Sequence, residues 1–375
     1  MTLSFKKLFF AIAAIFAVFA IMILAKSILI PIGFALLISF ILLPVTTRFE
    51  LWGANRMLAA FLSILSVILI LGGGIFLFST QIIEISKDLS DVKDKILRIF
   101  AEATLYINSN LNFIPNLEKD ELLQEIKDWI NKSAGSLARQ TFNGTAAFLA
   151  GMMFTVIFTF LILIYRNGLV KAFAQFYPSD RRERAVKMFH SVQQVGKKYL
   201  VGMILIIIIV GLMNSIGLLI IGLDKPFLFG FMASIMAIVP YVGTTLGATI
   251  PVVYAFMTYD SIWMPISIAI LFWSVQVVES NYLTPRIVGG GMKVNALAAL
   301  LSIIIGASLW GIAGMVLFLP FTAILKVVCE EYDQLKPIAL MIGEQNKKEN
   351  DGSVTFSSRW NEKIKSMVHS FIKNM

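Results

Sequence analysis

The stretch Ile238-Val-Pro240-Tyr-Val-Gly243-Thr-Thr-Leu-Gly247 interrupts an apolar segment, residues 226–257, that is too long for one membrane-spanning helix and too short for two. Pro240 and Gly243 break helices, so the sequence predicts two short helices joined by a turn. Backbone at such a break persists at membrane depth only inside protein or beside water. We therefore predict a re-entrant hairpin, with an ordinary hairpin packed through its glycines as the alternative. Its tip residues are Pro240, Tyr241, Gly243, Thr244 and Thr245.

A second apolar segment, residues 294–328, has a similar shape. Gly306, Gly311 and Gly314 mark its break, and Pro320 is expected to interrupt its second arm. Paired interrupted segments are the best sequence pointer to the binding site of a transporter. If both hairpins are re-entrant, the first enters from outside and the second from inside, so their tips meet near the midplane. An ordinary hairpin packed through its glycines is again the alternative.

The composition is that of a membrane protein. The chain is 58% hydrophobic and 15% charged, with a mean hydropathy of +0.81, whereas soluble domains are roughly 45–50% apolar. We predict an all-α polytopic membrane protein, with about six full transmembrane helices besides the two interrupted hairpins. The first helix is expected to stay uncleaved. The six runs cover residues 8–25, 27–45, 58–82, 144–165, 199–223 and 262–283.

The distribution of basic residues predicts the orientation of these spans. With the N-terminus in the cytoplasm, most lysines and arginines, above all those between residues 166 and 198, lie on the cytoplasmic side, as the positive-inside rule requires. Both termini are then cytoplasmic. The net charge of +9 is therefore interpreted as a topology signal and a contact with anionic membrane lipid, not as a nucleic-acid-binding surface.

Four parts follow from this topology. Residues 1–83 hold the first three spans, and residues 84–140 form an extracytoplasmic insert whose apolar residues recur at the spacing of amphipathic helices. We interpret the insert as a helical cap on the outer mouth; a gating or subunit-binding element is the alternative. Residues 141–344 form the transport domain with both hairpins, and residues 345–375 form a cytoplasmic linker and an amphipathic tail helix.

The sequence shows none of the motifs of an enzyme active site that we considered. Cys329 is the single cysteine, which excludes a disulfide framework and a cysteine-based metal cluster. His190 and His369 both lie outside the apolar spans. Motifs for zinc hydrolysis, nucleophilic serine catalysis and nucleotide binding are absent. We therefore expect neither an enzyme nor a bound cofactor or metal.

Glu279 is the one acidic residue within the predicted spans. Placing a carboxylate at membrane depth costs roughly 2.5–3.5 kcal/mol on insertion scales, so such a group rarely occurs without an interaction partner or a functional role. Helical spacing places it on one polar stripe with Gln276, and it is predicted to carry a proton or a cation. The alternative is a structural ion pair with Arg286 or Lys293. The residues predicted to serve transport or coupling are Glu279, Gln276, Asn281, Tyr282, Pro285 and Arg286.

Three of these segments resemble one known family. Pro240-Tyr-Val-Gly243, Glu279-Ser-Asn-Tyr-Leu-Thr-Pro-Arg-Ile-Val-Gly289 and the run from Gly306 to Pro320 are similar to the signature of the autoinducer-2 exporter family. The likeness extends over almost the whole chain. It implies a bacterial inner-membrane permease that forms homo-oligomers such as pentamers. Members of the family are associated with export of autoinducer-2, and some with sodium/proton exchange.

The leading interpretation is a secondary transporter that exports a small polar or amphiphilic metabolite or signal, such as autoinducer-2. Since no ATPase motif is present, a proton or sodium gradient, or the gradient of the substrate itself, would supply the energy. A Na⁺/H⁺ antiporter is the alternative within transport, although such exchangers commonly use more than one intramembrane carboxylate. A second alternative is a membrane scaffold that transports nothing, for which the broken hairpins have no use.

Overall fold

The computed structural model describes residues 5–74, 76–79, 81, 148–240, 242–289 and 294–344. The predicted extracytoplasmic insert, the tail helix, Tyr241 and Lys293 lie outside these described residues. Within them the regular structure is helical, and a single isolated bridge pairs Val294 with Gly343. This confirms the all-α class.

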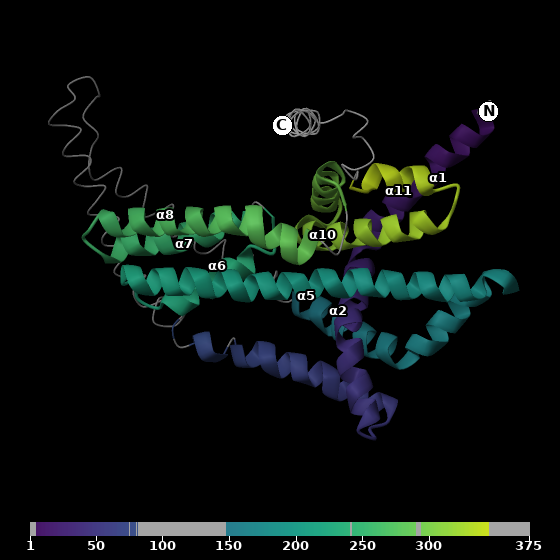
Figure 1. The fold of residues 1–375 in the computed structure, drawn as a ribbon, viewed down its shortest axis with the longest axis horizontal. Coiled ribbons are helices and arrows are strands. Elements are labelled where there is room, and N and C mark those ends of the chain that lie inside the picture. The colour runs from purple at the N-terminus through teal and green to yellow at the C-terminus, as the bar shows by residue number, and fades with distance from the viewer. Residues whose placement is uncertain are drawn as a thin grey trace, which may run out of the picture.

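The central element is α5 (Arg182–Ile221), a helix of 40 residues. At 1.5 Å per residue it is about 60 Å long, roughly twice the thickness of a hydrocarbon core. Figure 1 shows the helices of the second hairpin beside its N-terminal half and those of the first hairpin and the last predicted span beside its C-terminal half. The helices named here are α1 (Phe5–Leu24), α2 (Lys26–Leu51), α6 (Pro226–Met236), α7 (Val242–Thr258), α8 (Trp263–Val278), α10 (Ala296–Glu331) and α11 (Lys336–Ile342).

Among the described residues, six helices are long and apolar enough to cross a membrane, which confirms a polytopic membrane protein. The predicted first span is α1, an apolar helix of 20 residues that is not among these six. The predicted hairpin at 294–328 is among the six as α10, whose 36 residues include a non-helical turn at Gly311, so its length belongs to two arms and not to one straight helix. The six are Lys26–Leu51, Arg56–Ser79, Phe148–Gln175, Ser179–Ile221, Trp263–Val288 and Ala296–Glu331.

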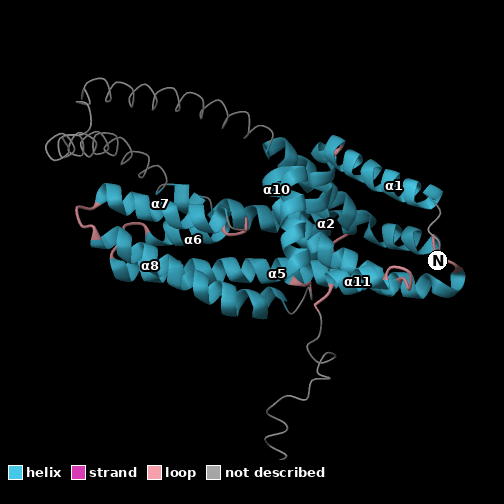
Figure 2. Ribbon diagram, turned by 90° about the horizontal axis from the view of Figure 1, so that it is seen from above, coloured by secondary structure: helices cyan, strands magenta, loops and turns pink. Residues whose placement is uncertain are grey.

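The helices Arg56–Ser79 and Phe148–Gln175 pack on α2, which crosses α5 (Figures 1 and 2). Leu42, Ala60 and Leu163 form the apolar contact between the three helices. At one end of this contact, an Arg166 guanidinium nitrogen lies 2.5 Å from a Glu50 carboxylate oxygen, and both side chains are about four-fifths buried. These three helices therefore form a unit tied by an ion pair as well as by apolar packing.

The second half of α10 packs between α2 and α5. Leu317 is fully buried against Leu37 and Phe40, and the Gly33 position on α2 lies against Leu317 as well. Beyond α10, the Tyr332 hydroxyl is hydrogen-bonded to that of Tyr177. The α10 hairpin is thereby held at several points along its second arm.

Candidate functional site

The segment that follows α8 leaves the α-helical pattern. Two successive π-helical segments, η2 (Glu279–Leu283) and η3 (Pro285–Gly289), continue the helix and are separated by Thr284. Pro285 has no backbone N–H, so the regular ladder of helical hydrogen bonds cannot pass through it. π-Helical turns are rare and frequently occur at functional sites. The run with the most specific sequence pattern is thus also the irregular part of this helix.

Glu279 opens the first π-helical segment and continues the buried stripe of α8. Ile268, Phe272 and Val275 are at most 7% exposed, and Glu279 follows Val275 at helical spacing. The Thr284 hydroxyl donates a hydrogen bond of 3.4 Å to Glu279 Oε1. Glu279 Oε2 is buried and accepts no hydrogen bond from the residues that the structure describes. A half-buried carboxylate, with Gln276 and Thr284 as its polar neighbours and with Oε2 unbonded, therefore faces the interior of the bundle.

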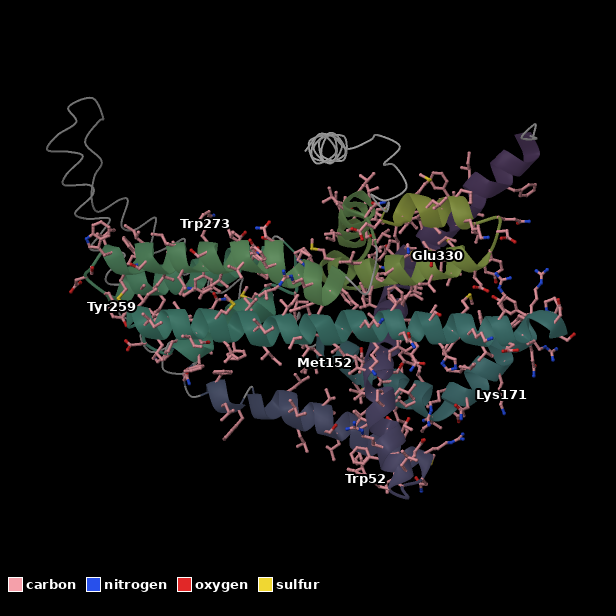
Figure 3. The ribbon with its side chains drawn as sticks, in the orientation of Figure 1. Trp52, Met152, Lys171, Tyr259, Trp273 and Glu330 are labelled. Carbon is pink, nitrogen blue, oxygen red and sulfur yellow. The ribbon has the colours of Figure 1, made fainter. Side chains whose placement is uncertain are left out.

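The other predicted residues on this segment are less enclosed. Gln276 is half-buried, one turn before Glu279, whereas Asn281, Tyr282, Pro285 and Arg286 are exposed. The Asn281 amide donates to the Val277 carbonyl at 2.9 Å. Among the described residues, Glu279 has no ion pair within 4 Å, so Arg286 does not neutralise it here. Trp273 points away from α5 and is 69% exposed (Figure 3).

The contacts between α8 and α5 fix the level of Glu279. A Cβ added at Gly217 would lie 2.6 Å from a Leu271 methyl carbon, and one added at Gly202 would lie 3.1 Å from Val288. The two helices are therefore antiparallel and closely packed. Glu279 lies about halfway between Leu271 and Val288 along α8, so it is level with the midpoint between Gly202 and Gly217 on α5.

The first hairpin reaches the same level of α5. A Cβ at Gly230 would lie 2.6 Å from the Ser215 nitrogen, and one at Gly211 would lie 2.9 Å from Ser234 Oγ. Helix α6 therefore runs back along α5 from the turn that follows Ile221, and it ends beyond Ser234. Because Gly211 lies near the midpoint defined above, the end of α6 and the Glu279 carboxylate occupy one level of the bundle.

The predicted break in the first hairpin is present. Helix α6 ends at Met236 and α7 begins at Val242, so the tip comprises residues 237–241. Any Cβ at Gly243 would overlap the Met236 carbonyl, which means that only glycine fits where the two arms meet. At the tip, Pro240 and Thr244 are half-buried and Thr245 is exposed. Thr244 and Thr245 both have interaction partners in the structure.

The second hairpin is α10, which turns at Gly311. Gly311 has φ 60° and ψ −137°, a conformation that favours glycine. A Cβ at Gly306 would lie 2.7 Å from the Gly314 carbonyl carbon, so the two arms touch through their main chains. Pro320 does not interrupt the second arm, contrary to expectation, because the helix continues through it. Near the tip, Trp310 donates a hydrogen bond of 2.8 Å to the Met22 carbonyl of α1.

Only part of the second hairpin lies near the Glu279 level. Leu319, on its second arm, packs against the cluster that contains Val210 and Val275. The tip contacts α1 instead. The structure thus places the end of α6 and Glu279 at one level of α5, and the second arm of the second hairpin packs near the same level.

Sequence reasoning overlooked Asn214 on α5. This residue is 3% exposed, and its Oδ1 accepts no hydrogen bond from any described residue. The signal was an amide inside a run of isoleucine, valine and leucine residues, in a helix otherwise without polar side chains larger than serine between residues 200 and 221. Within the described ranges, histidine, cysteine and carboxylate side chains form no group of three that could hold a metal ion.

Comparisons with known proteins agree with this architecture. The family model described as AI-2E family transporter matches residues 9–334. The chain is 27% identical over 311 residues to the putative transport protein YrrI of Bacillus subtilis (strain 168), which covers 81% of this chain and 86% of that protein. It is 23% identical over 325 residues to the AI-2 transport protein TqsA of Escherichia coli (strain K12), which covers 86% and 91%. The chain therefore belongs to the AI-2E transporter family and is a multi-pass membrane permease.

Proposed function

We propose that this permease is a secondary transporter that exports a small polar or amphiphilic solute, with Glu279 as the group that couples solute movement to a proton or sodium ion. The observation that carries the proposal is the Glu279 carboxylate, whose Oε2 is buried without a donor among the described residues. It lies at a π-helical break and level with the broken tip of the α6–α7 hairpin. A carboxylate in such a place can exchange a proton or cation for the polar hydrogens of a solute.

The name of TqsA makes autoinducer-2 the first solute to test. Purified protein is reconstituted into proteoliposomes and assayed with autoinducer-2 and a panel of polar metabolites, at set pH and sodium gradients. We expect gradient-dependent flux of at least one solute. Sodium/proton exchange that needs no solute would replace this proposal with an antiporter, and absence of any flux would favour a scaffold.

Glu279→Gln tests the coupling role directly, because it keeps the shape of the side chain and removes its charge. We expect solute flux to fall to the background of empty liposomes while the protein remains folded. Glu183→Gln is the matched control, since Glu183 is an exposed glutamate at the start of α5 whose partner is Lys187. Full flux in Glu279→Gln would remove the carboxylate from the mechanism.

Location and assembly belong to the same proposal. We infer a bacterial inner membrane with both termini in the cytoplasm, and a homo-oligomer in which copies pack through their apolar surfaces. Support comes from the helices Arg56–Ser79 and Phe148–Gln175, which bury only 12% and 11% of their most apolar window within one chain. The remainder must face lipid or another copy. Cross-linking in native membranes, followed by mass determination, tests the assembly, and a purely monomeric product would refute it.

A further inference from the structure

Asn214 is the buried polar side chain for which the proposed coupling role of Glu279 gives no account. Its neighbours in the bundle are satisfied within their own helices: the Ser215 hydroxyl donates to the Gly211 carbonyl at 2.7 Å, and Ser234 donates to the Phe231 carbonyl at 2.9 Å. Asn214 Oδ1 has no such donor among the described residues. An amide oxygen buried without a hydrogen bond destabilises a protein, so its presence requires a reason.

The position of Asn214 on α5 places it between two neighbouring helices. Gly211 and Ser215 face α6, while Val210 and Gly217 face α8. At 100° per residue, Asn214 lies between these two stripes. It therefore points into the interface that α5 shares with α6 and α8. The buried residues of α8 that lead to Glu279 line the same interface.

The offset of the two acceptors along the axis of α5 follows from the same contacts. Glu279 is level with a point one residue before Gly211, and Asn214 lies about one turn, or ~6 Å, farther toward the end of α5. Neither residues 199–221 of α5 nor α6, α7 and α8 contain a lysine or arginine. The site therefore offers acceptors and a negative charge, and it repels anions.

Building on the proposed transport function, we propose that Asn214 contacts the transported solute and that this solute is a small, non-anionic organic molecule with hydrogen-bond donors at both ends. One donor group binds Asn214 Oδ1 and the other binds Glu279 Oε2. The axial offset of ~6 Å is the smallest donor separation that reaches both acceptors, and it corresponds to a backbone of at least about four carbon atoms. Anionic solutes of equal length are excluded by the Glu279 charge.

A stability measurement separates a ligand contact from a structural residue. Asn214→Leu replaces an amide whose buried oxygen is unpaired by an apolar group of similar size, so we expect the thermal midpoint of the detergent-purified full chain to rise, by about 2–4 °C. Ser215→Ala is the matched control, a buried polar residue at the next position whose hydroxyl is already bonded to its own helix. A fall in the midpoint of Asn214→Leu would mean that the amide is paired and structural, which would overturn the proposal.

Binding is tested with three four-carbon probes: 1,4-diaminobutane, erythritol and succinate, each at 100 mM. We expect the diamine or the polyol to raise the midpoint of the wild type and of Ser215→Ala, and neither to raise that of Asn214→Leu. An equal shift by succinate, an undiminished shift in Asn214→Leu, or no shift in the wild type would each refute the proposal. Proteoliposome flux distinguishes failure of this proposal from failure of the proposed function. If flux is lost in Glu279→Gln but kept in Asn214→Leu, the transport function stands and only the role of Asn214 in solute binding is refuted.

Discussion

Gly243→Ala is the most direct test of the first hairpin. Alanine is normally the better residue in a helix, by up to about 1 kcal/mol. At position 243, however, the new methyl group would overlap the carbonyl of Met236 and lie 3.0 Å from the nitrogen of Ala237. These are main-chain atoms, so no side-chain rotation relieves the clash. Overpacking costs typically 1–3 kcal/mol, and we expect about 3 kcal/mol here, which is a change of roughly 100-fold in the folded-to-unfolded ratio.

The free energy of unfolding is measured by titration with sodium dodecyl sulfate in mixed micelles, together with the thermal midpoint. Gly168→Ala is the control, since a Cβ at this position in the helix Phe148–Gln175 meets no atom within 4 Å. We expect the control to be neutral or slightly stabilising. If Gly243→Ala is as stable as the wild type, α6 and α7 do not meet as the structure has them, and the shape of the hairpin tip at the level of Glu279 is refuted.

Three further predictions concern groups outside the site. Arg166→Ala leaves the partly buried Glu50 carboxylate unpaired and should cost about 2–4 kcal/mol of unfolding free energy, whereas a loss below ~0.5 kcal/mol would show the pair to be incidental. Tyr259→Phe removes the hydroxyl that donates to Asp224 at 2.8 Å, and should speed amide hydrogen exchange in the turn after α5; unchanged exchange would argue against that contact. Burial, together with its tyrosine partner after α10, raises the pKa of Tyr177 from 10.0 to about 12. The stability that the neutral Tyr177 side chain contributes to the fold is therefore fully present below pH 10 and is lost as the pH rises toward 12. Thermal midpoints between pH 8 and 12 should therefore fall less steeply in Tyr177→Phe, and parallel curves would contradict this.

The sequence was sufficient to predict the breaks in the apolar segments, because helix breaking is local chemistry. Pro240 has no backbone donor and lies between the end of α6 at Met236 and the start of α7 at Val242, and Gly243 follows in the first turn of α7. The glycine-rich break of the second hairpin was also predictable, but the separate structural roles of its glycines were not. Gly311 forms the turn, whereas Gly306 and Gly314 bring the two arms into contact. Both roles require glycine, so composition alone does not tell them apart.

The relative level of the helices could not be predicted, because it depends on which small residues meet across an interface. Gly211, Gly217 and Gly230 allow α6 and α8 to approach α5, and these contacts set the register of all three helices. The spacing of these glycines in the sequence does not show which residues they contact. The π-helical segments also escaped prediction: Pro285 signals a disturbance, but whether a helix responds by kinking or by widening depends on its packing.

Two irregular parts of the backbone coincide at one level of α5, and this coincidence limits what the site can be. The hairpin tip and the π-helical segments each leave main-chain groups outside the regular α-helical ladder. Unsatisfied main-chain groups at membrane depth are tolerated only where protein or water reaches them. The Glu279 carboxylate and the Asn214 amide add two further acceptors at or near this level. Either group alone could be a local imperfection. Together with two backbone breaks, they gather polar groups at or near one level of an apolar bundle, and the two unpaired acceptors there favour entry of water or a polar solute.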